Sequence, residues 1–414
     1  VSLKKRLGRS WERLGMRYKL SEMINEKWKE KTLGEVTSLI TKGIPPKYSE
    51  KENKTTIWVL NQKCNRNFEI SYSEARLHDC SLKKVPENRM LKNGDVLINS
   101  TGTGTAGRVA QLHNVVMPTT IDGHMILLRP TDEIDSLYYG YAIKSFQKQI
   151  EALAEGSTGQ TEINRQRLQN EVIIKFPIDK CKQRKISSFL SNLDKKIKVN
   201  IEINKNLEQQ AQTLYDKMMV SKVYPLKTLG SITQRNSLKV GNNNSITVLS
   251  ALNTGNLKPS EEYFSKQVFS KDTSKYILVN EGDFAYNPAR INIGSIGIND
   301  LGYIGCVSPV YVAFSVDPDY KAFFRFYLKT KGFREECKLR ASGSVRQALN
   351  YIDFARIETQ YPDREEAVIF NQQWNDYHDA ICSIVAETEK LIELRDSLLP
   401  QLMSGKFNIS DINI

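Results

Sequence analysis

An internal repeat constrains this fold more than any other feature, because the chain contains the same ordered motifs twice. Thr32-Leu33-Gly34 recurs as Thr228-Leu229-Gly230, and Gly94-Asp95-Val96 recurs as Gly282-Asp283-Phe284, at offsets of 196 and 188 residues. In both copies a glycine-rich stretch follows the second motif, and an aromatic, basic stretch follows that. A period this long exceeds that of solenoid repeats and predicts two similar domains.

Each copy ends in a long run with coiled-coil spacing. Steps of four and three residues alternate, and each position of the second run lies 184 residues after its counterpart. The two runs are Ile186, Leu190, Leu193, Ile197, Asn200, Asn204, Leu207, Ala211, Leu214 and Met218, and Phe370, Trp374, Tyr377, Ile381, Ile384, Thr388, Leu391, Arg395, Leu398 and Leu402. We expect two helices, 181–222 and 365–408, that bury these stripes against each other. A helix of about 34 residues is roughly 50 Å long, more than one turn of DNA.

The segments between these helices have mixed patterns and predict an α/β (mixed α+β) fold. Helices are expected at 136–154 and 320–338, and short β-branched runs predict strands at 96–100, 124–130, 171–177, 246–252, 276–280 and 310–316. The expected organisation is a basic N-terminal extension 1–27, a globular domain 28–180, a spacer helix 181–222, a second globular domain 223–364, a spacer helix 365–408 and a tail 409–414.

The charge balance favours a polyanionic partner. The chain has 59 Lys and Arg against 47 Asp and Glu, a net charge of +12. The six cysteines form no CxxC pair and there are only four histidines, so we expect no zinc site, no disulfide framework and free thiols in a reducing cytoplasm. No long apolar run or secretory signal is evident, so no membrane association is expected.

Catalytic motifs are missing. There is no GxxxxGK[ST] loop and no GxSxG elbow, and the nearest approach to a [DN]PP[YF] motif is Asn287-Pro288-Ala289-Arg290. The glycine-rich GTGTAG is interpreted as a loop that needs positive φ angles. Pro318-Asp319 followed by Glu336-Cys337-Lys338 fits a PD…ExK nuclease pattern, but ExK ends a helical stretch and the first copy has no equivalent. We therefore expect no catalytic residue and no metal site in this chain.

Taken in order, the motifs resemble the specificity (S) subunit of type I restriction–modification systems over residues 28–408. The first copy contributes KTLGEVTSLITKG, LKNGDVLINSTGTGTAGRVA and STGQTEINRQRLQNEVIIKFP. The second contributes KTLGSI, VNEGDFAYN and the final AETEKLIELRDSLLPQLMSGKF. KQRKISSFLSNLDKKIKVNIEINKNLEQQAQTLYDKM is similar to the central spacer helix of that family.

The resemblance implies a non-catalytic subunit that reads duplex DNA. Two target recognition domains each read one half of a bipartite, asymmetric site, and the two spacer helices pack antiparallel in a pseudo-two-fold arrangement. Two methyltransferase subunits that modify adenine N6 dock on this frame, and two motor-nuclease subunits join them. S-adenosylmethionine, ATP and Mg belong to those partners, so no cofactor is expected here. The location implied is the nucleoid in the bacterial cytoplasm.

Candidate DNA contacts are polar residues in loop-like stretches beside the repeated motifs. Phosphates are contacted by basic, hydroxyl and backbone N–H groups, and base edges by Arg, Lys, Asn and Gln. The first-domain candidates are Thr41, Lys42, Ser100, Thr101, Thr103, Thr105, Gln160, Asn164, Arg165 and Arg167. The second-domain candidates are Arg235, Asn236, Asn287, Arg290, Asn292, Arg346, Gln347 and Asn350.

Four apolar residues beside the helical stripes, Ile201, Ile203, Leu399 and Met403, widen the apolar surface. A wider stripe predicts a second contact with the methyltransferase subunits, and packing against the globular domains is the alternative. Two further functions stay open: a stand-alone DNA-modifying enzyme, and a coiled-coil scaffold that does not bind DNA. Binding of S-adenosylmethionine by the isolated chain would favour the first, and salt-insensitive binding the second.

Overall fold

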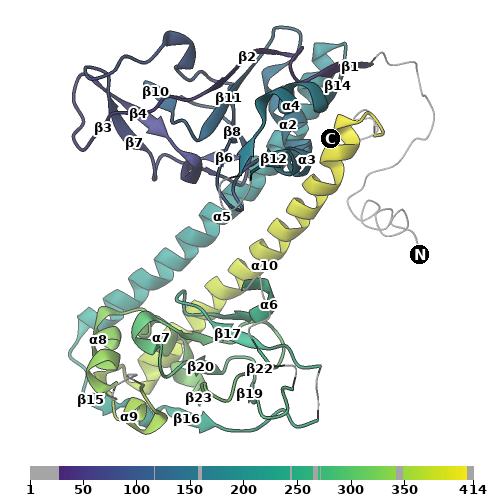
Figure 1. Cartoon of the computed structure of the whole chain (residues 1–414). Helices are drawn as coiled ribbons and strands as arrows, with labels where there is room; N and C mark the ends of the chain where they lie inside the picture. The colour runs from purple at the N-terminus through teal and green to yellow at the C-terminus, as the bar shows by residue number, and fades with distance from the viewer. Residues whose placement is uncertain are drawn as a thin grey trace. The chain divides into compact units, whose positions relative to one another are not determined.

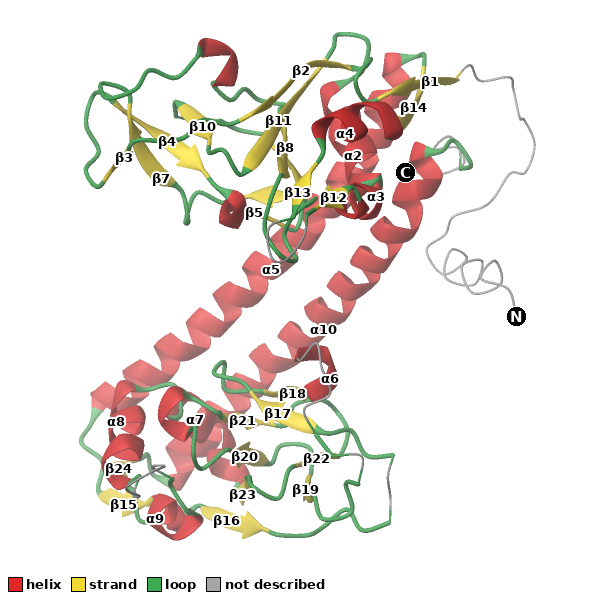
Figure 2. Ribbon diagram, in the orientation of Figure 1, coloured by secondary structure: helices red, strands yellow, loops and turns green. Residues whose placement is uncertain are grey.

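The computed structural model describes residues 28–407 except 116, 157–160, 243–244, 264–268, 271 and 342–347. The extension 1–27 and the tail 409–414 lie outside these residues. The chain divides into two compact units. Unit 1 comprises Val1–Val199 and Thr388–Ile414, and unit 2 comprises Asn200–Glu387. The elements are labelled in Figure 1 and coloured by type in Figure 2.

Unit 1 is built on a four-stranded antiparallel sheet of order β2-β11-β8-β9. Its strands are β2 (Thr37–Lys42), β8 (Val96–Asn99), β9 (Val109–Gln111) and β11 (Met125–Pro130). Alternate residues of a strand point to opposite faces. Val96 and Ile98 accordingly join a core with the helices, while Leu97 joins a second core. Both faces are covered, which explains why β8 is buried at every position.

A second four-stranded sheet of order β10-β4-β7-β3 completes unit 1, together with three two-stranded pairs, β1-β14, β12-β13 and β5-β6. The bounds are β1 (Trp28–Thr32), β3 (Tyr48–Ser49), β4 (Thr56–Leu60), β5 (Asn65–Arg66), β6 (Glu69–Ile70), β7 (Arg76–Asp79), β10 (Thr119–Ile121), β12 (Ala154–Glu155), β13 (Glu162–Ile163) and β14 (Ile173–Pro177), with 3-10 turns η1 (Gln62–Cys64) and η2 (Glu87–Arg89).

The helix predicted over 136–154 is two helices, so that prediction was wrong in its extent. α2 (Ser136–Ser145) ends at Phe146, and α3 (Gln147–Ala152) follows directly. The ψ angle of Phe146 is 7°, outside the helical range, and its ring packs against the helical core. A third short helix, α4 (Arg165–Glu171), lies just before β14.

Unit 2 has its own four-stranded antiparallel sheet, of order β16-β23-β20-β21. Two-stranded pairs are β15-β24, β17-β18 and β19-β22. The bounds are β15 (Leu226–Thr228), β16 (Thr233–Asn236), β17 (Leu249–Ala251), β18 (Leu257–Pro259), β19 (Ile277–Val279), β20 (Phe284–Tyr286), β21 (Ile296–Ile298), β22 (Gly305–Val307), β23 (Val312–Val316) and β24 (Glu358–Gln360), with η3 (Leu229–Ser231), η4 (Ile291–Ile293) and η5 (Pro318–Tyr320).

The helix predicted over 320–338 is also divided, into α7 (Lys321–Tyr327) and α8 (Lys331–Arg340). Thr330 explains the break, because its side chain accepts a hydrogen bond from the N–H of Phe333 (3.2 Å) and so caps a new helix. The remaining short helices of unit 2 are α6 (Ser260–Tyr263) and α9 (Tyr351–Ala355).

The two long helices that the sequence predicts are present as α5 (Lys180–Ser221) and α10 (Arg364–Met403). The second ends earlier than expected because Gly405 has a φ of 72°, the left-handed conformation of a helix stop. All twenty stripe positions are buried or half-buried. The amphipathic pattern therefore identified the packed face correctly.

Within each unit the two helices run in opposite directions. In unit 1, Arg395 of α10 binds Asp194 of α5 (Nη1 to Oδ1, 2.9 Å), and earlier α5 residues share a core with later α10 residues. In unit 2, Tyr215 of α5 packs against Phe370 of α10 with ring centroids 6.0 Å apart, and Asn200 donates to Glu387 (2.8 Å).

Of the four residues expected to widen the apolar surface, two are exposed and two are buried. Ile201 and Ile203 are 58% and 39% exposed. Leu399 and Met403 are only 8% and 4% exposed, because they pack into the helical core of unit 1. For that pair the alternative, packing against the globular domain, is the one the structure supports.

Candidate nucleic-acid interface

The loop between β8 and β9 holds the glycine-rich motif of unit 1. Gly102 and Gly104 have φ angles of 108° and 71°, as the sequence predicted for this loop. At its base, Ser100 is fully buried and its N–H donates to the carbonyl of His124 (2.8 Å). Thr101 Oγ1 lies 2.9 Å from Nδ1 of the same histidine. Ser100 therefore supports the loop from within.

The threonines of this loop differ in accessibility. Thr103 is exposed near the tip, whereas Thr105 is half-buried and donates through Oγ1 to the carbonyl of Thr101 (3.4 Å). Arg108 bonds back to the carbonyl of Gly104 (3.1 Å), which fixes the far side of the loop. Thr103 is thus the loop candidate most open to a ligand.

Three sequence-predicted segments of unit 1 lie together. Lys42 on β2 forms an ion pair with Glu162, and Thr101 forms an isolated bridge with the same residue. Thr41 donates to the carbonyl of Lys42 (3.1 Å). The end of β2, the glycine-rich loop and the segment that leads into α4 therefore form one surface, with the Lys42 charge partly neutralised.

The candidates on α4 have different surroundings. Asn164 caps the helix by accepting from the N–H groups of Gln166 and Arg167 (3.0 and 3.2 Å). Arg167 is bound to both Glu171 and Glu155, and these bonds raise its pKa. Arg165, by contrast, is exposed and has no ion pair within the described part of the chain. Gln160 lies outside the described residues.

In unit 2, the arginines are the accessible candidates. Arg235 on β16 and Arg290 before η4 are exposed and form no ion pair with any described residue. Asn236 is engaged through both side-chain ends, with the carbonyl of Leu278 (3.0 Å) and the N–H of Leu238 (3.0 Å).

The remaining unit 2 candidates are mainly turn and cap residues. Asn287 accepts from the N–H of Ala289 (3.0 Å), and Asn350 caps α9 by accepting from the N–H of Asp353 (3.0 Å). Asn292 is half-buried in η4. Arg346 and Gln347 lie outside the described residues. All eighteen candidates stay predictions, because neither geometry nor burial tests DNA contact.

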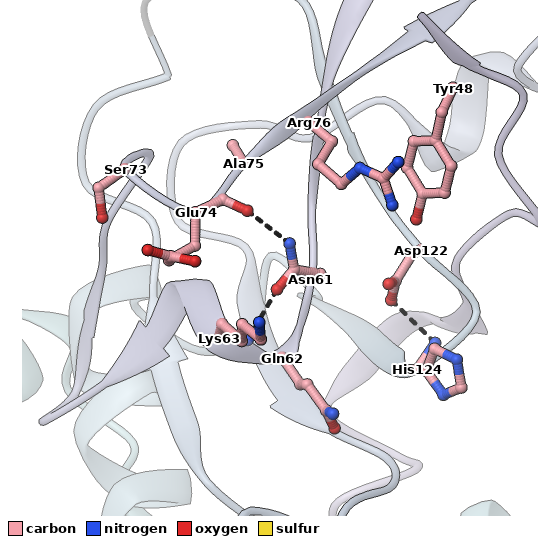
Figure 3. Close-up of a pocket in the computed structure, with 10 residues that line it drawn as sticks. All are labelled: Tyr48, Asn61, Gln62, Lys63, Ser73, Glu74, Ala75, Arg76, Asp122 and His124. Atoms are coloured by element: carbon pink, nitrogen blue, oxygen red, sulfur yellow. Dashed lines mark hydrogen bonds between the residues drawn. The ribbon is translucent and has the colours of Figure 1, made fainter. Parts of the chain in front are cut away.

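A recess in unit 1 contains polar residues that the sequence did not single out (Figure 3). Its volume is about 420 Å³. The lining residues are Tyr48, Asn61, Gln62, Lys63, Ser73, Glu74, Ala75, Arg76, Asp122 and His124. No repeat motif marks them, and strand pairing joins segments distant in sequence, so no sequence signal could have identified the set.

Electrostatics within the recess are set by burial and by local pairing. Burial raises the pKa of Asp122, and the hydrogen bond that its Oδ1 accepts from the N–H of His124 (2.9 Å) opposes this shift. The Arg76 guanidinium lies over the Tyr48 ring, 3.4 Å from its centroid. Figure 3 shows Asp122 between this pair and His124.

The carboxylates of the nuclease-like pattern are in structural ion pairs. Asp319 in η5 binds Arg364 (2.6 Å), and Glu336 on α8 binds Arg340 one turn later (3.1 Å). Glu336 is on a helix rather than a strand, which does not fit the nuclease pattern. Among the described residues, no group of three or more His, Cys, Asp or Glu side chains could hold a metal ion. None of the described helices is long and apolar enough to cross a membrane.

Comparison with known proteins gives a family match for part of the chain and a similar fold for nearly all of it. Residues 25–209 match the model of the type I restriction modification DNA specificity domain, which confirms the resemblance found in the sequence. The fold is similar to that of the type I restriction–modification S subunit from M. genitalium, with a TM-score of 0.57 and 17% identity over 94% of this chain and 99% of that one.

The HsdS subunit from Thermoanaerobacter tengcongensis also aligns with this chain, with a TM-score of 0.36 and 13% identity over 94% of this chain and 99% of that one. No curated protein is significantly similar in sequence.

Proposed function

We propose that this chain, whose residues 25–209 match the model of the type I restriction modification DNA specificity domain, is the DNA specificity subunit of a type I restriction–modification complex. The single observation that carries the proposal is that family match. It is supported by the similarity of fold to an S subunit over nearly the whole length, and by the net charge of +12. The chain reads duplex DNA in the bacterial cytoplasm and leaves catalysis to its partners.

The target that we propose is bipartite and asymmetric. Each unit has a four-stranded sheet in which corresponding strands of the repeat occur in the same order, β2-β11-β8-β9 and β16-β23-β20-β21. A second pairing also corresponds, β1-β14 and β15-β24. This agreement supports a pseudo-two-fold internal repeat of two target recognition domains. Because their loops differ in sequence, each domain reads a different half-site.

The role that we assign to α5 and α10 is to set the spacing between the half-sites. Their alternating four- and three-residue stripe, buried or half-buried throughout, supports a coiled-coil packing. We infer that the methyltransferase subunits dock on the apolar residues that this packing leaves uncovered, among them Ile201 and Ile203. Buried Leu399 and Met403 are not part of that surface.

Catalysis belongs to the partners in this proposal. Two methyltransferase subunits supply S-adenosylmethionine chemistry at adenine N6, and two motor-nuclease subunits supply the steps that need ATP and Mg. The specificity subunit holds DNA and positions those subunits on it. The ion pairs of Asp319 and Glu336 agree with this division, because both carboxylates already have arginine partners.

A methylome tests the proposal. The full chain is expressed with its cognate methyltransferase subunit in a methylation-free bacterial host, and the genome is sequenced for N6-methyladenine. We expect one asymmetric two-part motif with a fixed gap. Arg165→Ala and Arg235→Ala should disturb opposite halves of that motif, since these exposed arginines belong to different units.

Two outcomes would contradict the proposal. A purified, co-eluting complex that leaves the genome unmodified would show that the chain does not direct methylation. DNA affinity of that complex that is independent of salt would contradict phosphate contact, because log K falls with log salt in proportion to the phosphates neutralised. The scaffold function would then be favoured.

A further inference from the structure

The recess of unit 1 is built by two strands and a turn that hold side chains in fixed positions. β3 pairs with β7 so that Tyr48 lies opposite His78, which places Arg76 diagonally from Tyr48 on the same face of the sheet. The guanidinium of Arg76 stacks on that ring, 3.4 Å from its centroid. Arg76 is exposed and has no ion pair within the described part of the chain. Its plane is held in place while its hydrogen-bonding edge is available to a ligand.

Gln62 reaches the recess from η1. Asn61 fixes that turn by accepting from the N–H of Lys63 (2.8 Å) and donating to the carbonyl of Glu74 (2.6 Å). The Gln62 Oε1 atom is buried and has no hydrogen-bond partner among the described residues. A buried polar atom without a partner costs free energy unless a ligand satisfies it. The Oε1 atom of Gln62 is therefore a recess acceptor that no described residue satisfies.

The recess is continuous with the glycine-rich loop. A Cβ atom at Gly102 would lie 2.5 Å from Gln62 Oε1, and the φ angle of 108° favours glycine at this position, so Gly102 lets the loop lie close to this amide. On the other side, Thr101 of the loop contacts His124, which lines the recess. Gln62, the loop and His124 thus form one surface with segments that the sequence predicted to contact DNA.

The net charge of the recess favours base edges over phosphate as its ligand. Two basic side chains, Lys63 and Arg76, face two acidic ones, Glu74 and Asp122, so the formal charges cancel. A phosphate site would need an excess of positive charge. Base edges present donors and acceptors together in the major groove, which suits a neutral surface with both kinds of group.

We propose that this recess reads base pairs in the half-site bound by unit 1, with Arg76 and Gln62 as specificity-determining residues. Arg pairs with O6 and N7 of guanine and Gln with N6 and N7 of adenine, so each side chain discriminates one base pair. The stack on Tyr48 orients Arg76. The Gln62 Oε1 atom is buried beside Gly102 in the free protein and reaches a base edge when the glycine-rich loop moves on binding DNA. This inference deepens the proposed function and rests on it.

The test compares complexes of the full chain with its methyltransferase partner. The readout is competition binding to duplexes in which each position of the wild-type motif is varied in turn. Variants are Arg76→Ala, Arg76→Lys and Gln62→Ala, with Arg66→Ala as the matched control, an exposed arginine of the same unit outside the recess. Arg76→Lys keeps the charge and removes the bidentate fork.

We expect Arg76→Ala and Arg76→Lys to reduce the preference for the wild-type base pair over the other base pairs by about 5- to 100-fold at one position of one half-site. Gln62→Ala should reduce this preference by a similar factor at another position of the same half-site. The other half-site should keep its full discrimination, which also shows that each variant complex is folded and assembled. Arg66→Ala should match the wild type.

Three results would overturn the inference. Unchanged discrimination in all recess variants would show that the recess does not contact bases. Uniform weakening at every position would assign Arg76 to phosphate. If Arg76→Lys and Gln62→Ala both reduced base-pair preference in both half-sites, the recess would stabilise the structure of the complex and would not read bases. Failure of the proposed function would give a different result from failure of this inference, because the wild-type complex itself would then methylate no specific DNA motif.

Discussion

Comparison of the two units shows which part of the repeat is retained and which is replaced. Both have the same order of strands in the main sheet, and both cover one face of that sheet with short helices and the ends of α5 and α10. On the opposite face, unit 1 has the four-stranded sheet β10-β4-β7-β3, whereas the described residues of unit 2 form the pairs β17-β18 and β19-β22. The retained side packs on the long helices, and the replaced side includes the recess.

The two cores reach the same architecture with different side chains. In unit 1 the helical face of the sheet is aliphatic, with Val96, Ile98 and Leu128. The corresponding face in unit 2 is aromatic, and Phe284 stacks on Phe314 with ring centroids 5.7 Å apart. Strand pairing places Leu128 opposite Val96 and Phe314 opposite Phe284, so these positions are equivalent in the two sheets. The two copies of the repeat therefore share the packing of helices on a sheet, but not the side chains that make the contacts.

Removal of the central aromatic ring should have the largest effect. Phe314→Ala deletes a fully buried ring that contacts Phe284, Phe324 and Phe354, and should destabilise unit 2 by about 3–5 kcal/mol. Hydrogen exchange measured by mass spectrometry should show faster exchange in unit 2 peptides alone. Leu128→Ala is the control and should act on unit 1 alone. Equal changes in both units would contradict their independence.

An ion pair distinguishes the repeated Gly-Asp motif of the two units. In unit 1, Asp95 has a side chain only 1% exposed and binds Arg129 through two bonds of 2.8 and 2.7 Å. Arg129→Met leaves this buried carboxylate without its cation and should destabilise unit 1 by about 3 kcal/mol. Urea unfolding, followed by exchange in unit 1 peptides, measures the loss. A change under 1 kcal/mol would show that Asp95 does not depend on its pair.

The equivalent Asp283 of unit 2 should respond to pH in the opposite sense to a salt-bridged acid. Burial raises its pKa, while bonds from Asn280 oppose the shift. A carboxyl with a raised folded-state pKa contributes stability below its unfolded pKa, and that contribution is lost as pH rises through the folded value. Asp283→Asn should therefore stabilise unit 2 at neutral pH.

The measurement is the difference in melting temperature between Asp283→Asn and the wild type, from neutral pH down to a pH below 3.8, the ordinary pKa of an Asp carboxyl. The stabilisation should shrink as pH falls, because the wild-type carboxyl then becomes neutral too. Asp95→Asn is the matched control in unit 1 and should destabilise at neutral pH, since it leaves Arg129 without its anion. A constant difference across pH would contradict the buried-carboxyl explanation for Asp283.

Sequence patterns predicted the long-range layout because it depends on regular spacing. The stripes of α5 and α10 have a fixed period, and every stripe position is buried or half-buried. Breaks in shorter helices were missed because they depend on single residues, the non-helical backbone of Phe146 and the cap at Thr330. These local interactions do not alter the apolar period, so the pattern continued across them.

The candidate interface was predictable only in part, for a related reason. The glycine-rich loop stands out because its residue types need unusual backbone angles, and Gly102 and Gly104 have them. The recess has no such signal. Tyr48 and Arg76 meet only through the pairing of β3 with β7, and the side-chain partners of a strand cannot be inferred without its register.

The smallest effect is expected for Arg167, and it sharpens the comparison between paired and free arginines on α4. Arg167→Ala breaks exposed ion pairs with Glu155 and Glu171, and exposed pairs contribute little to stability. We expect no measurable shift in melting temperature and no change in the methylated motif, because both carboxylates already hold this side chain. Arg165→Ala is the matched variant two residues earlier on α4, with no such ion pair among the described residues, and should alter the motif. The opposite result would be a loss of base preference at one position of the motif in Arg167→Ala, with an intact motif in Arg165→Ala. That result would show that DNA displaces Glu155 and Glu171 from Arg167. Ion pairing in the free protein would then not indicate which arginines contact DNA in the complex.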